Sequence, residues 1–222
     1  MYMSLPNLPG KSAHLRMAPE HRIASLSVEI DPPEGAVESA VLVIIFPQKR
    51  ENPPIDPHIQ PLMDWEVLLI ERSKYDGVHS GEIAFPGGKR EMWDKDFIDT
   101  ACREANEEMA IKNKDLTIFG LLSRLYVPPS NHTIHPVLAC ACWNTELIPR
   151  EREVISFKKI PIGYFNPATA QICTIETSRG DVVRAPAFIY EDYMIWGATA
   201  MILSELYQVV LEARLITSFI KP

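Results

Sequence analysis

The order of apolar and polar residues predicts a chain that is rich in strands. Residues 40–46 (AVLVIIF) form an unbroken run of β-branched and large apolar side chains, which is typical of a strand buried on both faces. Further strands are predicted at residues 66–72, 82–85, 117–127, 133–143, 154–160, 171–177, 182–190 and 193–196. Because most of these strands follow one another without a helix between them, the pattern favours a mixed sheet of the α+β class over a doubly wound parallel sheet.

A few helices complete this pattern. Apolar residues recur at helical spacing at about residues 96–109 and again at about residues 198–214, so each range is predicted to form a helix. A shorter helix is predicted near residues 11–16. We expect residues 1–39 to form an N-terminal arm on the surface together with a lead-in strand, and residues 40–222 to form one domain.

The composition excludes several classes of protein. The chain has 222 residues, and its 22 basic and 29 acidic side chains give a net charge of −7. A duplex nucleic-acid binder is not expected, because its affinity would rest on Lys and Arg neutralising phosphates. No apolar run approaches the roughly 18 residues of a membrane span, and prolines interrupt the amino terminus where a secretory signal needs an apolar run. Four cysteines without a CxxC pair are typical of a reducing compartment, so we expect a cytoplasmic protein that binds neither nucleic acid nor membrane.

The helix predicted at residues 96–109 carries three glutamates on one side. Glu104, Glu107 and Glu108 stand at positions i, i+3 and i+4, so their carboxylates fall within an arc of about 100°. Like charges at this spacing destabilise a helix, and Arg103 can pair with Glu107 but cannot neutralise all three. Mg²⁺ prefers carboxylate oxygens and completes its coordination with substrate phosphates. The arc is therefore a candidate metal site, although a helix with three glutamates is more often only a solvated surface.

Two glycines before this helix make the metal site the stronger interpretation. Gly87 and Gly88 follow a predicted strand and Pro86, and glycine allows both positive φ and close backbone approach. A turn at this point can bring main-chain groups to a metal or a phosphate beside the glutamates. The strand, the Gly-Gly turn, the acidic Asp94 and the helical Arg-Glu-x-x-Glu-Glu sequence are together more specific than any one of them.

The segment from Phe85 to Ile111, FPGGKREMWDKDFIDTACREANEEMAI, resembles the conserved box of the Nudix hydrolases. The family's box has a glycine, then an acidic residue, then Arg-Glu-apolar-x-Glu-Glu-x-Gly-apolar. The matching positions in this chain are Gly88, Asp94, Arg103, Glu104, Ala105, Glu107, Glu108 and Ile111. Asp94 stands for the family's usual glutamate and Ala110 for its usual glycine, and the stretch before Arg103 is one residue longer than the commonest form.

This resemblance implies a Nudix-type α/β/α sandwich that hydrolyses a diphosphate bond in a nucleoside diphosphate derivative, with Mg²⁺ or Mn²⁺ as the cofactor. The metal ligands that it implies are Glu104, Glu107, Glu108 and Gly88. The catalytic residues that it implies are Glu107, Glu108 and Arg103. In these roles Glu107 is a third ligand or the general base, and Arg103 orients the glutamates. The base could also come from a later loop, where Glu151 and Glu153 are candidates.

The segment before the box resembles the coenzyme A diphosphatase branch of the family. It reads LLIERSKYDGVHSGEIAFPGG and shares with that branch Leu-Leu, Arg-Ser, a glycine and Phe-Pro-Gly-Gly. The resemblance implies cleavage of coenzyme A into adenosine 3′,5′-bisphosphate and 4′-phosphopantetheine, with Arg72, Ser73 and Lys89 as candidate substrate-binding residues. Two alternatives stay open: another nucleotide substrate such as ADP-ribose or a dinucleotide, and a Nudix-fold sensor that binds a nucleotide without turnover. The family-level expectation for assembly is a homodimer.

Overall fold

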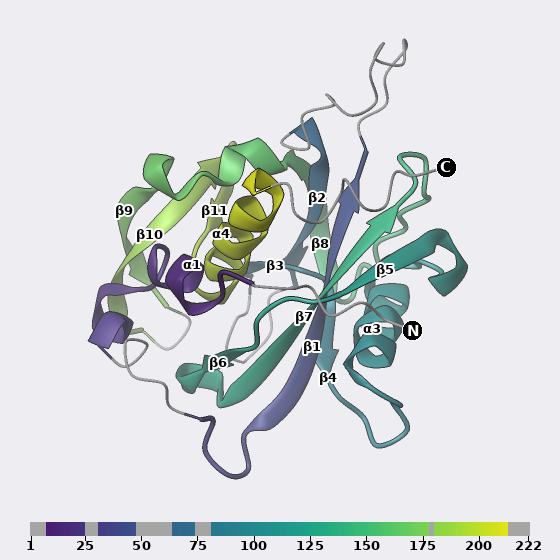
Figure 1. Ribbon diagram of the computed structural model, residues 1–222, viewed down its shortest axis with the longest axis horizontal. Coiled ribbons are helices and arrows are strands. Elements are labelled where there is room, and N and C mark those ends of the chain that lie inside the picture. The colour runs from purple at the N-terminus through teal and green to yellow at the C-terminus, as the bar shows by residue number, and fades with distance from the viewer. Residues whose placement is uncertain (1–7, 25–30, 48–63, 74–80, 178–179, 213–222) are drawn as a thin grey trace.

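The computed structural model describes residues 8–24, 31–47, 64–73, 81–177 and 180–212 (Figure 1). The helices are α1 (Lys11–Leu15), α3 (Phe97–Met109) and α4 (Gly197–Leu211). The strands are β1 (Val37–Phe46), β2 (Glu66–Arg72), β3 (Ile83–Ala84), β4 (Gly87–Lys89), β5 (Leu116–Leu121), β6 (Leu125–Val127), β7 (His132–Ala141), β8 (Val154–Pro161), β9 (Gln171–Glu176), β10 (Val182–Tyr190) and β11 (Tyr193–Ile195).

A mixed sheet forms the centre of the fold. Its main path runs β3-β2-β1-β7-β5, and in addition β4 pairs with β1, β6 with β7 and β8 with β2. β1 and β7 are parallel, whereas the other pairs are antiparallel. β2 pairs with the end of β1, at Ile45 and Phe46, and β4 pairs with its start, from Ser39 to Val41. The sheet therefore divides along one side of β1, and Arg72 at the end of β2 reaches β4 across the division.

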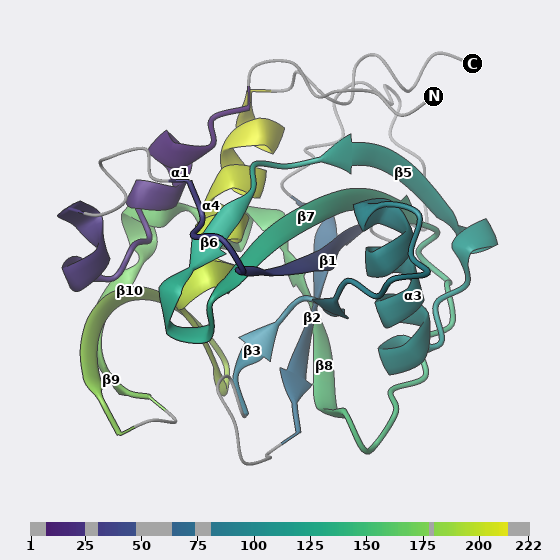
Figure 2. The same cartoon turned by 90° about the horizontal axis from the view of Figure 1, so that it is seen from below.

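Helices cover both faces of this sheet and give the fold three layers (Figures 1 and 2). α3 lies on one face, and α4 lies on the other face together with α1 and the small sheet β11-β10-β9. Successive residues of β1 alternate between the two layers. Leu42 and Ile44 belong to the apolar cluster under α3, and Val43 and Ile45 to the cluster under α4. The expected α+β class, with a mixed sheet and flanking helices, is confirmed.

The helix α3 begins and ends where local interactions favour it. Asp96 caps its first turn, because one carboxylate oxygen accepts the N–H of Asp99 at 2.8 Å. The helix stops at Ala110, which has a left-handed φ of 56° and donates its N–H to Asn106 O at 2.9 Å. The small buried Ala105 lies on its sheet-facing side, so the helix can lie close to β1.

Three expectations about the elements need correction. The single strand expected at residues 117–127 is two strands, β5 and β6, separated by residues 122–124. Gly87 and Gly88 lie in the short strand β4 instead of a turn. The described part of the expected surface arm is partly buried, since Ala13 and Met17 are buried and Met17 belongs to the apolar cluster under α4.

No helix in the described residues is long and apolar enough to cross a membrane. The longest helix among the described residues is α4, with 15 residues. A helix that spans a bilayer needs about 20 residues that are mainly apolar.

Candidate active site

In the strand β4, the N–H and C=O groups of Gly87 are not used for pairing with the neighbouring strand β1. Ala40 of β1 lies opposite Gly88. Neighbouring residues in an antiparallel strand point their N–H and C=O groups in opposite directions. The N–H and C=O groups of Gly87 therefore point away from β1. Its N–H donates to Glu108 Oε2 at 2.9 Å, and its carbonyl oxygen accepts from Arg72 Nη1 at 3.2 Å. A Cβ on Gly87 would lie 2.4 Å from Ala40 O, so this close approach of backbone to backbone requires glycine.

Glu108 is a buried carboxylate held by two partners. Its side chain is 2% exposed, and its Oε1 lies 3.0 Å from Arg72 Nη2. The other oxygen accepts the N–H of Gly87. Burial raises the pKa of Glu108 to about 7, and the negative charges of Glu104 and Glu153 act in the same direction. Arg72 and the Gly87 N–H lower this pKa but do not outweigh burial.

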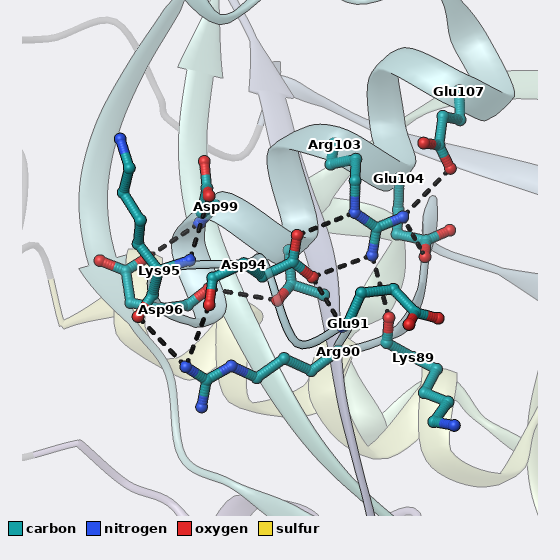
Figure 3. A network of polar contacts seen from close by, with 11 residues as sticks. Lys89, Arg90, Glu91, Asp94, Lys95, Asp96, Asp99, Arg103, Glu104 and Glu107 are labelled. Carbon is teal, nitrogen blue, oxygen red and sulfur yellow. Dashed lines mark hydrogen bonds and ion pairs between the residues drawn. The ribbon is translucent and has the colours of Figure 1, made fainter.

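Arg103 makes five hydrogen bonds, four to the carboxylates around it and one to a backbone carbonyl (Figure 3). Nε and Nη2 donate to the two oxygens of Asp94 at 2.9 and 3.0 Å, and Nη2 also donates to Lys89 O at 3.0 Å. Nη1 donates to Glu104 Oε1 at 2.8 Å and to Glu107 Oε2 at 3.1 Å. The hydrogen bonds from Arg103 lower the pKa of Asp94 to about 2. The expected pair of Arg103 with Glu107 is therefore present, within a larger network that sets the positions of two glutamates.

The three glutamates of the arc have different surroundings. The side chain of Glu107 is 50% exposed, whereas that of Glu104 is 16% exposed. The Glu104 carboxyl group lies against Gly88, because a Cβ built on Gly88 would be 2.6 Å from its carboxyl carbon. Burial raises the pKa of Glu104, and Arg103 partly offsets this shift. The structure thus brings Glu104 and Glu108 together beside β4, and Glu107 faces outward.

The three candidate substrate-binding residues are placed differently from one another. Arg72 contacts Glu108 and Gly87, as described above. Ser73 follows it and donates its N–H to Glu153 O at 2.9 Å, which ties β2 to the loop before β8. Lys89 is exposed, and its amine extends away from the carboxylates while its carbonyl oxygen accepts from Arg103 (Figure 3).

The donor atoms beside β4 fit a hard divalent cation. The carboxylates of Glu104 and Glu108 and the carbonyl of Gly87 are oxygen ligands of the kind that Mg²⁺ and Mn²⁺ prefer. Within residues 8–212, apart from the stretches that the structure does not describe, no three Asp, Glu, His or Cys side chains converge as a finished metal centre. Each glutamate of the arc is paired with an arginine, Glu104 and Glu107 with Arg103 and Glu108 with Arg72.

Sequence reasoning did not anticipate two features of this site. It gave Gly88 as the glycine at the metal, which stays a prediction, and it did not foresee that Gly87 donates its N–H to Glu108 and accepts from Arg72 with its carbonyl oxygen. The two adjacent glycines were the available signal, since in a strand one of two neighbouring peptide groups must point away from the partner strand. It also gave Asp94 no partner, and no sequence signal links the loop position of Asp94 to Arg103 on the helix.

The family model that describes the NUDIX domain matches residues 38–183, which include the whole arrangement of β4, α3 and Arg72. The chain belongs to the Nudix family. Hydrolases of this family act on small nucleotides and generally use divalent metal ions. The predicted family is therefore confirmed, as is its hydrolase class.

Individual relatives agree with this membership. The uncharacterized Nudix hydrolase NudL of Yersinia enterocolitica is 34% identical over 145 residues, which cover 65% of this chain and 73% of the relative. The human mitochondrial coenzyme A diphosphatase NUDT8 is 31% identical over 140 residues, which cover 61% of this chain and 58% of the relative. The crystal structure of RenU, a Nudix hydrolase of M. smegmatis, matches with a TM-score of 0.50 at 16% identity and covers 90% of this chain and 98% of RenU, which shows a shared fold.

Proposed function

We propose that this Nudix hydrolase cleaves the diphosphate bond of coenzyme A, with Mg²⁺ or Mn²⁺ as its cofactor. The observation that carries the proposal is that two carboxylates lie against adjacent glycines of β4, Glu108 against Gly87 and Glu104 against Gly88. The sequence leading into FPGG and the 31% identity to human NUDT8 support coenzyme A as the substrate. We assign the activity to residues 40–222, with residues 1–39 as the arm and lead-in strand.

The metal ligands in this proposal are Glu104, Glu108 and a glycine carbonyl, with Glu107 as a further ligand. The direction of the Gly87 carbonyl supports Gly87 in the position for which the sequence suggested Gly88. A bound divalent cation would neutralise phosphate oxygens and lower the pKa of a water molecule. Arg103 contacts the glutamates instead of the substrate, so it acts as a positioning residue.

Two carboxylates are candidates for the base that accepts the proton of the attacking water. Glu107 is half-exposed and held by Arg103 at 3.1 Å, so it can exchange protons with solvent. Glu153 lies close enough to raise the pKa of Glu108, and its backbone is tied to the end of β2. The variants Glu107→Gln and Glu153→Gln distinguish the two, because loss of the base removes the acidic limb of the kcat profile against pH.

Arg72 is the described side chain best suited to the substrate's phosphates. Its guanidinium is planar and can bind two phosphate oxygens at once. It is also 26% exposed and lies at the glutamates, where the scissile phosphates must bind. The Lys89 amine points outward, so we expect a smaller contribution from it.

Product analysis tests the proposal. The protein is incubated with coenzyme A and either Mg²⁺ or Mn²⁺, and we expect mass spectrometry to detect adenosine 3′,5′-bisphosphate and 4′-phosphopantetheine. The variant Glu108→Gln should lower kcat at least about 10²-fold, because it removes a charged ligand of the cation that would neutralise the reacting phosphates. Arg184→Gln is the control, since Arg184 is 62% exposed and pairs with Glu20 at the other sheet.

Other outcomes would redirect the proposal. If coenzyme A stays intact while ADP-ribose or a dinucleotide is consumed, the metal chemistry stands and the substrate is wrong. If no diphosphate is cleaved with either metal, but a nucleotide binds, the protein is a sensor and the catalytic roles given to the glutamates are wrong.

A further inference from the structure

One guanidinium holds two of the oxygen atoms that the proposed function gives to the metal. Arg72 Nη2 lies 3.0 Å from Glu108 Oε1, and Arg72 Nη1 donates to Gly87 O at 3.2 Å. A carboxylate oxygen and a carbonyl oxygen are the ligands that a hard divalent cation prefers. Arg72 therefore satisfies, with one delocalised positive charge, the same pair of acceptors that a cation would use.

The burial of Glu108 explains why a positive group lies there. A carboxylate that is 2% exposed is costly to keep ionised without a partner of opposite charge. The neighbouring Arg103 is committed elsewhere, because its five N–H groups already bond to Asp94, Glu104, Glu107 and the Lys89 carbonyl. In the described part of the chain, Arg72 is the cation paired with Glu108.

The two arginines also differ in how firmly they are held. Arg103 makes five hydrogen bonds from the middle of a helix. Among the described residues, the side chain of Arg72, at the end of β2, makes one hydrogen bond and one ion pair. The side chain of Arg72 is 26% exposed, so it has solvent beside it into which it can turn. Of these two arginines, Arg72 is the one that can leave its partners without disturbing the helix.

We propose that Arg72 is an exchangeable counter-ion: it neutralises Glu108 before the metal binds, releases Glu108 and Gly87 O when a divalent cation takes those oxygens, and then binds the substrate's phosphates. This inference rests on the metal site of the proposed function. It follows from charge, because a guanidinium and a divalent cation on the same oxygens would repel each other strongly. The released guanidinium remains at the site, and its planar fork matches phosphate oxygens.

This exchange couples two binding events. The metal makes the guanidinium available, so phosphate should bind better after the metal, and by linkage the metal should bind better in the presence of phosphate. An arginine that always faced the phosphates would strengthen phosphate binding equally with and without metal. The two possibilities differ in a measurable way.

Calorimetry of Mn²⁺ binding to the full chain is the first test, at alkaline pH so that Glu108 is ionised in every variant. Arg72→Gln should bind Mn²⁺ about tenfold more tightly than the wild type, because the competing cation is gone. Arg72→Lys should fall between them, since one ammonium cannot hold both acceptors in the same geometry. Arg184→Gln removes the same charge at a distant exposed site and should match the wild type. Equal or weaker Mn²⁺ binding by Arg72→Gln overturns the exchange.

The second test uses methylenediphosphonate, a diphosphate analogue that cannot be hydrolysed. With Mn²⁺ present, Arg72→Gln should bind the analogue about tenfold more weakly than the wild type. Without metal, the two proteins should bind it within about twofold, because Arg72 is then occupied by Glu108. The same loss in both conditions means that Arg72 is a permanent phosphate ligand and that the exchange is wrong.

A third variant separates this inference from the proposed function. If the wild type binds Mn²⁺, Glu108→Gln does not, and Arg72→Gln gains nothing, the metal site stands and the exchange alone is wrong. If neither the wild type nor Arg72→Gln binds Mn²⁺ better than Glu108→Gln, the metal site is wrong and the exchange falls with it. Thermal melting in metal-free buffer checks that each variant is folded.

Discussion

Replacing Gly87 and Gly88 with alanine, one at a time, should separate the stability of the site from its chemistry. The two glycines are neighbours in β4, and each substitution adds one methyl group. What differs is the atom that the methyl group would meet. At Gly87 that atom belongs to the backbone of β1, and at Gly88 it belongs to the side chain of Glu104.

Gly87→Ala should destabilise the fold. The added Cβ would lie 2.4 Å from Ala40 O and 2.6 Å from Val41 Cα, about 1 Å closer than atoms in ordinary contact. The backbone of β1 cannot move aside, because β7 pairs with it along its other edge. β4 must therefore separate from β1, at a cost of about 3 kcal/mol. For a domain of this size the melting temperature should fall by about 10 °C.

Gly88→Ala should leave stability almost unchanged and lower activity. The added Cβ would lie 2.6 Å from the carboxyl carbon of Glu104, which is the end of a flexible side chain. The carboxylate can move by about 1 Å and loosen its contact with Arg103, which costs at most about 1 kcal/mol. A catalytic group displaced by that distance lowers turnover by about 10²-fold.

Two measurements check this pair of predictions. Circular dichroism melts give the stability of each variant, and steady-state hydrolysis of coenzyme A with Mg²⁺ gives kcat. The reasoning is refuted if Gly88→Ala keeps kcat within about twofold of the wild type. It is equally refuted if Gly87→Ala melts at the wild-type temperature, since the contact with Ala40 O would then not constrain the strand.

Three further predictions follow from buried or strained groups. Ala110→Gly should raise the free energy of unfolding by about 0.5–1 kcal/mol without changing kcat, because a left-handed φ of 56° strains alanine; urea unfolding measures it. Glu205→Gln should cost about 2 kcal/mol in the same assay, since this fully buried carboxylate accepts the N–H groups of Gly10 and Ser123 with one oxygen and lies 3.0 Å from His14 Nε2 with the other, and an amide replaces one of these two oxygens with an NH₂ group. Burial raises the pKa of Glu108 from 4.5 to about 7, so its contribution to metal-free stability is complete below pH 4.5 and is lost as pH rises through 7. Unfolding across this range should show the wild type losing about 3 kcal/mol relative to Glu108→Gln.

The elements with strong periodic patterns were predictable from the sequence. β2 and β10 have the predicted bounds, and α3 begins one residue later than predicted, after its cap at Asp96. β2 and α3 each pack an apolar side against the core, and β10 does so from Ala185 onward, so the side chains of these segments show the period of the element. Local pattern is sufficient where burial is continuous.

The break between β5 and β6 was not predictable in this way. Ser123 lies at the break, and its N–H donates to both carboxylate oxygens of Glu205, at 3.3 and 3.2 Å. Glu205 is on α4, far along the chain, and the apolar residues on each side of Ser123 continue the strand pattern without interruption. The strand breaks where Ser123 binds the carboxylate of Glu205, and the residues around Ser123 contain no signal for this contact.

Helical spacing predicted that the three glutamates share one side of the helix, but it did not predict how deeply each side chain is buried. The exposed fractions of the side chains are 2% for Glu108, 16% for Glu104 and 50% for Glu107. The difference comes from the contacts that β4 and β2 make with α3, because Gly87 of β4 and Arg72 of β2 both cover Glu108. A helix pattern alone therefore identifies a set of candidate ligands, and only the neighbouring strands decide which of them can share one cation.

The loop before α3 holds Asp94 in place for Arg103. Glu91 donates its N–H to Asp94 Oδ2 at 2.9 Å, and Arg90 donates to the carbonyls of Asp94 and Lys95, so the loop folds back on itself. In this position the carboxylate of Asp94 accepts from Nε and Nη2 of Arg103 at 2.9 and 3.0 Å. Because Arg103 in turn holds Glu104 and Glu107, the positions of two glutamates of the arc depend on a loop outside the helix.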